Sequence, residues 1–178
     1  MDLRNPTASL YVPDRTDPSE AGRRVTHLGV GAHQDDLEIM AYHGIRQCYD
    51  DPHRWFGGVV CTDGARSPRA GRYADCTEGE MRRLRSEEQI EAARMGRYGF
   101  VAQLGYSSDA VRKKSCPDLV EDLLHIVSET SAKVIYTHNL ADLHETHIRV
   151  SLTLIEALRR LPENKRPEAL FEIGRAHV

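Results

Sequence analysis

The strongest constraint on the fold is a regular alternation of short apolar runs with longer segments of helical periodicity. Such a run occurs four times, and apolar residues at helical spacing follow each one. Parallel strands need a crossover, usually a helix, between them. The alternation therefore predicts an α/β fold, with a mostly parallel sheet and helices on both faces. We expect strands at residues 28–32, 56–61, 100–104 and 133–137, and helices at 37–48, 77–95, 117–127 and 148–161.

Two of these helices carry more detailed predictions. Thr77 begins one of them with the spacing of a capping box. On this helix Met81 and Met95 should face the core. Arg85 and Glu88 lie inside or at the border of that face, so either they pair with each other or Arg85 points to the strand ends. The last helix should turn four side chains inward: Ile148, Ser151, Leu152 and Ile155.

Composition supports one globular domain. The chain has 178 residues, 40% hydrophobic and 29% charged, with a net charge of -3 from mixed signs. Nothing in it indicates a nucleic-acid partner, a secretory signal or a membrane span. The cysteines form no C-x-x-C pair, so neither a thiolate zinc site nor a disulfide framework is predicted. Free thiols fit a reducing compartment, and we expect a cytoplasmic location. The cysteines are Cys48, Cys61, Cys76 and Cys116.

The chain divides into three expected segments. Residues 1–24 carry scattered prolines and charges, which predict an irregular lead-in. Residues 25–171 form the domain itself, with a long Gly/Pro/Arg-rich loop at 65–75 of the kind that often binds ligands. Residues 172–178 look like the translation of a sequencing-library adapter. We therefore expect the natural protein to continue past residue 171 and His177 to carry no function.

Polar clusters follow the first and the fourth expected strands. One histidine and two aspartates stand within residues 33–36, and three histidines accompany Asp142 within residues 138–147. A helix cap explains only one of the first three side chains. Ligands of parallel sheets bind beyond the carboxyl ends of the strands. If the first and fourth strands are neighbours, both clusters line one pocket.

These clusters contain the side chains of a catalytic metal site. Two imidazoles and a carboxylate with one open position are a recognised zinc arrangement. If His33, Asp36 and His147 are the ligands, a second carboxylate and a second imidazole remain beside them. Asp35 fits a general base, and His144 fits a group that stabilises an oxyanion. The residues therefore predict metal-assisted hydrolysis of an amide or an ester.

Other motifs fit less well. Gly29-Val-Gly31 is similar to the opening of a dinucleotide fingerprint, but Gln34 stands where the third glycine belongs. The second cluster has the wrong spacing for a zincin, because Ile148 occupies the place of the second histidine. His138 stays open between a structural and a supporting role. A non-catalytic Rossmann-like module that binds a nucleotide or a glycan remains the alternative from another class.

Residues 32–36 (Ala-His-Gln-Asp-Asp) and 144–147 (His-Glu-Thr-His) resemble the paired motifs of the LmbE-like, or PIG-L, family of zinc-dependent de-N-acetylases. The resemblance covers about residues 25–161. It implies a Rossmann-like three-layer α/β/α domain over residues 25–171, with the first and fourth strands adjacent. The implied reaction is hydrolysis of an N-acetyl group, commonly on N-acetylglucosamine. Arg85 matches a family arginine that grips sugar hydroxyls.

The resemblance also implies individual roles in the site. His33, Asp36 and His147 would bind zinc, and ferrous iron accepts similar ligands. Asp35 would deprotonate the attacking water. His144 would stabilise the oxyanion and help to protonate the leaving amine.

The chain departs from the family pattern at two positions. Gln34 replaces a common proline and is expected only to shape the turn. Thr146 stands where the family usually has an aspartate, and Asp142 is expected to supply the charge that tunes His144. The implied partner is a small N-acylated molecule, with a sugar, a non-sugar amide and a thiol conjugate all open. The sequence leaves both a monomer and a homo-oligomer open.

Overall fold

The computed structural model describes residues 3–174, apart from the side chain of Arg72. Within these residues one six-stranded sheet has the order β1-β4-β3-β2-β5-β6. β1 runs antiparallel to β4, and the other neighbours are parallel. The predicted mostly parallel sheet is confirmed, and so is the adjacency of β2 and β5. The strands are β1 (Ser9–Tyr11), β2 (His27–Gly31), β3 (Phe56–Thr62), β4 (Phe100–Tyr106), β5 (Val134–His138) and β6 (Ala169–Ile173).

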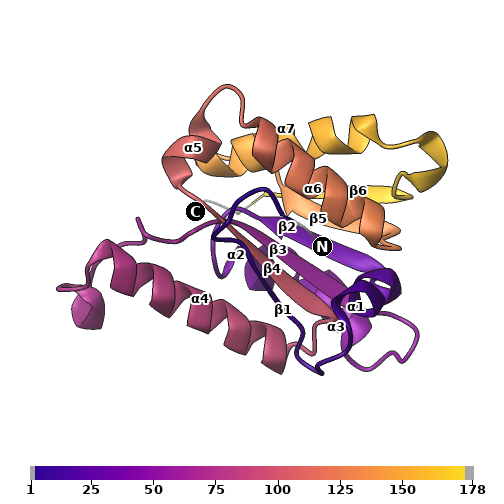
Figure 1. Ribbon diagram of the computed structural model, residues 1–178, viewed down its shortest axis with the longest axis horizontal. Coiled ribbons are helices and arrows are strands. Elements are labelled where there is room, and N and C mark those ends of the chain that lie inside the picture. Colours follow the sequence, from indigo (N-terminus) through magenta and orange to yellow (C-terminus); the bar gives the residue numbers. More distant parts are fainter. Residues whose placement is uncertain (1–2, 175–178) are drawn as a thin grey trace.

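Helices cover both faces of this sheet and form the two outer layers (Figure 1). One face packs against α5 (Ser108–Arg112), α6 (Pro117–Glu129) and α7 (Glu145–Arg160). The other face packs against α2 (Asp36–Met40), α3 (Tyr42–Tyr49) and α4 (Glu78–Met95). The short α1 (Pro18–Arg24) lies beside α6. Among the described residues no helix has the length and apolar character needed to cross a membrane.

Two glycines allow α2 to approach the sheet closely. Leu37 is fully buried and packs over β2 and β3. A Cβ atom on Gly58 would stand 2.7 Å from Leu37 Cδ1, and a Cβ atom on Gly29 would stand 3.0 Å from Leu37 Cδ2. The absence of side chains at these two positions therefore fixes how closely α2 and the turn before it approach the strand ends.

The predicted irregular lead-in is wrong for two segments. Residues 9–11 form β1, which pairs with β4 at the edge of the sheet. Asp17 caps α1, because its carboxylate accepts the backbone N–H groups of Ser19 and Glu20. A three-residue strand is too short to show alternation. The helix, in contrast, has a local sequence signal, because Asp17 stands at the cap position directly before Pro18.

The expected segment boundary at residue 171 falls inside β6. Glu172 and Ile173 pair with Thr137 and His138 of β5. The expectation that residues 172–178 are adapter-derived stays a prediction, and residues 175–178, including His177, lie outside the described residues.

Two helix faces differ from expectation. The capping box at Thr77 and the burial of Met81 are confirmed, but Met95 is 65% exposed. Gln89 is buried on α4 instead, since this charged helix has a poorly defined apolar stripe. On α7 the buried face is centred on Leu154, and Leu152 is 43% exposed.

Candidate metal centre

The turn after β2 is anchored to both neighbouring strands. The backbone N–H of Ala32 donates to Nε2 of His138 at 2.9 Å, at the end of β5. The carbonyl of Ala32 accepts the hydroxyl of Thr62 at 2.7 Å and its backbone N–H at 2.9 Å, at the end of β3. These bonds hold residues 33–36 at the carboxyl edge of the sheet.

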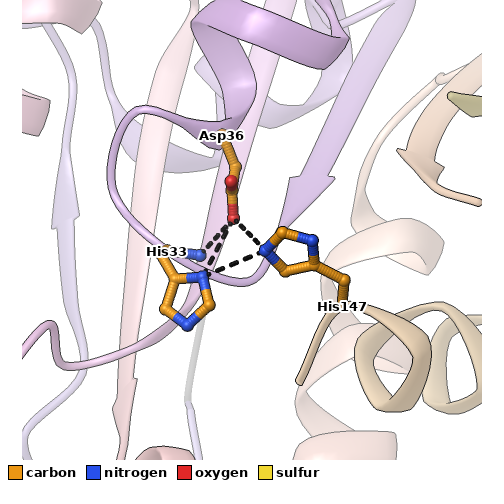
Figure 2. A group of neighbouring side chains, drawn as sticks. All are labelled: His33, Asp36 and His147. Atoms are coloured by element: carbon orange, nitrogen blue, oxygen red, sulfur yellow. Dashed lines mark hydrogen bonds and ion pairs between the residues drawn. The ribbon is translucent and has the colours of Figure 1, made fainter. Parts of the chain in front are cut away.

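Three donor atoms meet at this edge (Figure 2). Nδ1 of His33 lies 3.3 Å from Oδ2 of Asp36 and 3.3 Å from Nε2 of His147. The third separation, between His147 and Asp36, is 3.5 Å. Tetrahedral zinc with bonds of about 2.1 Å places its ligand atoms about 3.4 Å apart. The donor set and its spacing therefore fit a zinc ion, and the two sequence-distant clusters meet as predicted.

The protonation states of the buried members suit metal binding. Burial raises the pKa of Asp36, but the neighbouring imidazoles of His138 and His33 outweigh it and hold this pKa well below its usual range. Burial, reinforced by the nearby His138, lowers the pKa of His147 to about 4. Asp36 is therefore ionised and His147 neutral near pH 7, which are the forms that coordinate metals.

Asp142 forms hydrogen bonds with the ring of His147 and with the backbone of His144. Its Oδ2 lies 3.0 Å from Nδ1 of His147, and its Oδ1 accepts the backbone N–H of His144 at 2.8 Å. Burial raises the pKa of Asp142, but these two hydrogen bonds outweigh burial, so the pKa lies below its usual value. A carboxylate on Nδ1 leaves Nε2 as the metal-binding atom. Asp142 contacts the ring of His147 directly, and its charge also opposes the lowering of the His144 pKa by burial, so the expectation that Asp142 tunes His144 stays a prediction.

His138 also belongs to the support of this site. Its ring stacks on that of His147, with centroids 3.9 Å apart and planes 7° apart. His138, Asp142 and His147 form a second group close enough to hold a metal. Nδ1 of His147 and Oδ2 of Asp142 lie 3.0 Å apart, which is the length of a hydrogen bond between them. Nε2 of His138 already accepts the N–H of Ala32, so its lone pair is engaged. The first group, His33, Asp36 and His147, is therefore the better candidate for a metal centre.

Asp35 has a backbone conformation that non-glycine residues rarely adopt. Its φ is 80° and its ψ is −20°, in the left-handed region. Its N–H donates to Oε1 of Gln89 at 3.2 Å, and its carboxylate pairs with Arg85 at 2.9 Å. Strained conformations persist where surrounding contacts enforce them. Here α4 provides both contacts.

Arg85 satisfies both interpretations made from its spacing. It pairs with Glu88 at 2.7 Å and also reaches the strand ends, where it contacts Asp35 and the carbonyl of Gln34. Burial lowers the pKa of Arg85, but the hydrogen bond to Asp35 outweighs it, so the net shift is upward. The guanidinium therefore remains charged beside the expected general base.

Gln89 links the backbone of Asp35 to polar side chains in the core. The sequence did not predict this role. It is 1% exposed, and its Nε2 donates to Oε1 of Glu38 at 2.9 Å. The hydroxyl of Tyr98 donates to the same oxygen at 2.7 Å. A buried polar chain thus runs from Tyr98 through Glu38 and Gln89 to the backbone of Asp35. A glutamine on a charged helix gives no sequence signal of this role.

A cavity of about 440 Å³ opens over these groups. The ring of His144 borders it, 4.4 Å from the ring of His147 and 5.0 Å from that of His33 by centroid. Burial, followed by the charge of His33, lowers the pKa of His144. All the residues predicted to act in the reaction line this cavity: His33, Asp35, Asp36, Arg85, His144 and His147.

Other lining residues were not predicted individually. Arg66, Ser67 and Pro68 come from the loop expected to bind ligands, and Ser108 and Arg112 come from α5. The length of the loop was the only sequence signal for the three loop residues. No sequence signal pointed to the two residues of α5.

Gln34 does more than shape the turn. Its side chain is 2% exposed, and its Nε2 donates to the carbonyl of Thr62 at 3.1 Å. It thereby ties the first polar cluster to the end of β3.

The fold and the site define a Rossmann-like α/β/α protein with a His-Asp-His donor set at the carboxyl edge of its sheet. The chain belongs to the PIG-L (LmbE-like) family, since the family model described as GlcNAc-PI de-N-acetylase matches residues 28–158. This match confirms the resemblance seen in the two motifs. No curated protein matches the chain.

Solved structures share the fold at low identity. The conserved protein TT1542 from Thermus thermophilus is 21% identical, with a TM-score of 0.68 over 86% of this chain and 68% of its own. N,N'-diacetylchitobiose deacetylase from Pyrococcus horikoshii, complexed with its inhibitor MPG, is 19% identical, with a TM-score of 0.64 over 85% of this chain and 56% of its own. GalB, the 4-carboxy-2-hydroxymuconate hydratase from Pseudomonas putida KT2440, is 20% identical, with a TM-score of 0.58 over 85% of this chain and 62% of its own. The chain thus spans 56% to 68% of these structures.

Proposed function

We propose that this chain is a metal-dependent hydrolase that removes an N-acyl group, typically acetyl, from an amino sugar of the N-acetylglucosamine type. The observation that carries the proposal is the donor triangle of His33, Asp36 and His147, with sides of 3.3, 3.3 and 3.5 Å. Membership of a de-N-acetylase family supports the choice of amide. The hydratase GalB shares the fold, so the proposal rests on the site rather than on the fold.

Zinc is the proposed metal, with ferrous iron as the alternative. His33 and His147 offer imidazole nitrogens and Asp36 offers a carboxylate oxygen, which both ions accept. When bound, the ion would supply Lewis acidity and lower the pKa of a coordinated water. Asp142 would keep the ring of His147 oriented through its 3.0 Å contact.

Asp35 and His144 would carry the proton transfers. Both line the cavity beside the donor triangle. Asp35 would accept a proton from the attacking water, and its contact with Arg85 at 2.9 Å supports this placement. His144 would stabilise the oxyanion that forms at the amide carbonyl and then protonate the leaving amine. Arg85 would bind sugar hydroxyls from the same wall while it positions Asp35.

The cell compartment is a further part of the proposal. All four cysteines are free. Free thiols support a reducing, cytoplasmic location. The proposed partner is a small N-acylated molecule, and neither a nucleic acid nor a particular oligomer is required by the site.

Metal analysis and amine release test this function together. We expect about one zinc or iron per chain, and release of a primary amine from at least one member of a panel of N-acetylated sugars and non-sugar amides. Asp35→Asn should keep the metal and lose activity by about 10²- to 10⁴-fold, the usual contribution of a general base. His33→Ala should lose metal and activity together.

His53→Ala is the matched control, because this exposed histidine lies outside the cavity and should change neither metal content nor rate. A purified chain that holds no metal and gains no activity with zinc or ferrous iron would contradict the proposal.

A further inference from the structure

The loop between β3 and α4 forms part of the cavity wall and contacts α4 near both of its ends. Gly64 and residues 66–68 line the cavity. Gly64 has a φ of 69°, and a Cβ atom there would stand 2.9 Å from Cβ of Arg85. Near the other end, the hydroxyl of Tyr73 donates to Oε1 of Glu88 at 2.9 Å. The loop therefore packs against Arg85 at one end and bonds its partner Glu88 at the other.

A chain of hydrogen bonds leads from Tyr73 to Asp35. Glu88 accepts the hydroxyl of Tyr73 on Oε1 and Nη1 of Arg85 on Oε2, the second at 2.7 Å. Nη2 of Arg85 donates to Oδ2 of Asp35 at 2.9 Å. The Arg85 side chain is only 19% exposed, so water competes weakly for these charge-assisted bonds. The guanidinium therefore keeps the direction that its two carboxylate partners set.

Arg69 ties the two parts of the loop together. Its Nε donates to the carbonyl of Cys76 at 2.8 Å, and its Nη2 donates to the carbonyl of Ala65 at 3.2 Å. The backbone N–H of Cys76 in turn donates to the carbonyl of Tyr73 at 3.1 Å. These bonds join the part of the loop that lines the cavity to the part that carries Tyr73. A displacement of the wall therefore reaches the hydroxyl that bonds Glu88.

We infer that Tyr73 is a positioning residue for Asp35, the proposed general base. The hydroxyl of Tyr73 orients the carboxylate of Glu88, which orients the guanidinium of Arg85. Arg85 in turn sets the direction of the Asp35 carboxylate. Tyr73 is not among the described lining residues, so it acts without touching substrate. The inference rests on the proposed function and makes the alignment of Asp35 depend on a loop that is seated on α4.

Limited proteolysis tests the contact between the loop and α4 without turnover. Residues 65–76 contain three arginines, so trypsin can cut the loop when it leaves α4. Tyr73→Phe should be cut there about tenfold faster than the unmodified chain, the effect of one hydrogen bond to a charged group on the open population. Tyr42→Phe is the matched control and should not change the rate, since Tyr42 is 63% exposed on α3 and does not line the cavity. Equal cleavage of Tyr73→Phe and the unmodified chain would overturn the inference.

Steady-state kinetics of the metal-loaded chain test the effect on Asp35. Tyr73→Phe should lower kcat about tenfold, because a small misplacement of a catalytic group has effects of this size. Metal content should stay the same, and KM should change less than kcat. Tyr42→Phe should keep both constants. An unchanged kcat with a raised KM would mean that Tyr73 only shapes the wall, and would overturn the inference.

A double-mutant cycle shows whether Glu88 transmits the effect. In the Glu88→Ala background the bond from Tyr73 is already broken, so Tyr73→Phe should lower kcat no further. A further tenfold loss in that background would overturn the inference. An unmodified chain that releases no amine from any substrate would reject the proposed function and this inference together. Full kcat in Tyr73→Phe, beside an active unmodified chain, would reject the inference and leave the hydrolase intact.

Discussion

The strained backbone of Asp35 connects the proposed general base to two side chains of α4, of which Gln89 lies outside the cavity lining. Its φ of 80° is held on one side by Arg85 and on the other by the N–H bond to Gln89. Gln89 in turn is fixed by Glu38. We therefore propose that Gln89 positions Asp35, the proposed general base.

Gln89→Leu should lower kcat by about tenfold to hundredfold, because a small displacement of a catalytic group has effects of this size. KM and metal content should change little. Gln103→Leu is a matched control, since Gln103 is also buried but bonds Ser86, away from the metal centre. Both variants should lose similar stability, and an unchanged kcat in a folded Gln89→Leu chain would contradict the positioning role.

Asp142→Asn should weaken zinc binding by about 10- to 100-fold, because the ring of His147 loses its anionic partner. Oδ1 of the asparagine can still accept the N–H of His144, so the loop should keep its shape. Competition with a chelator measures the affinity. Full zinc affinity with lost activity would instead support the prediction that Asp142 tunes His144.

At the scale of elements, the contact of α2 with the sheet sets the position of the first polar cluster. Gly58→Ala would place a Cβ atom 2.7 Å from Leu37 Cδ1 within the core. We expect a loss of about 1–3 kcal/mol in the free energy of unfolding, the usual cost of overpacking. Zinc affinity should also fall, because displacement of α2 moves Asp36 away from the other two ligands.

Gly79→Ala is the control for this substitution, since an added Cβ at Gly79 on α4 meets no atom within 4 Å. This change should be neutral or stabilise by up to about 1 kcal/mol. Chemical denaturation measures both variants. Equal stability of the two, with unchanged zinc affinity in Gly58→Ala, would contradict the close-approach argument.

At the scale of the whole molecule, the candidate metal centre joins two distant parts of the chain. His33 and Asp36 follow β2, whereas His147 lies in α7, at a separation of 114 residues from His33. A metal that binds only the folded state stabilises it by about 2.7 kcal/mol at 100 times its Kd. For a chain of this size, zinc should raise Tm by about 5–10 °C. His147→Ala should abolish this increase, and a Tm that does not respond to zinc in the unmodified chain would contradict the site.

The prediction of elements succeeded where the signal is local. Four strands, the capping box at Thr77 and the helix after Cys116 follow from periodicity and caps. β1 and β6 were missed because short edge strands carry little alternation. The burial of Gln89 in place of Met95 was missed because α4 is charged around most of its circumference and packing selects its inner face.

The sequence by itself determined the alternating α/β order, the two polar clusters and the types of ligand they offer, since these depend on side chains close together in the chain. Tertiary structure decided which of them meet. It joined Asp142 to His147, Gln89 to Asp35, and Arg66 and Arg112 to one carboxylate. Such contacts depend on the angle and depth at which helices pack on the sheet, and no local pattern encodes these quantities.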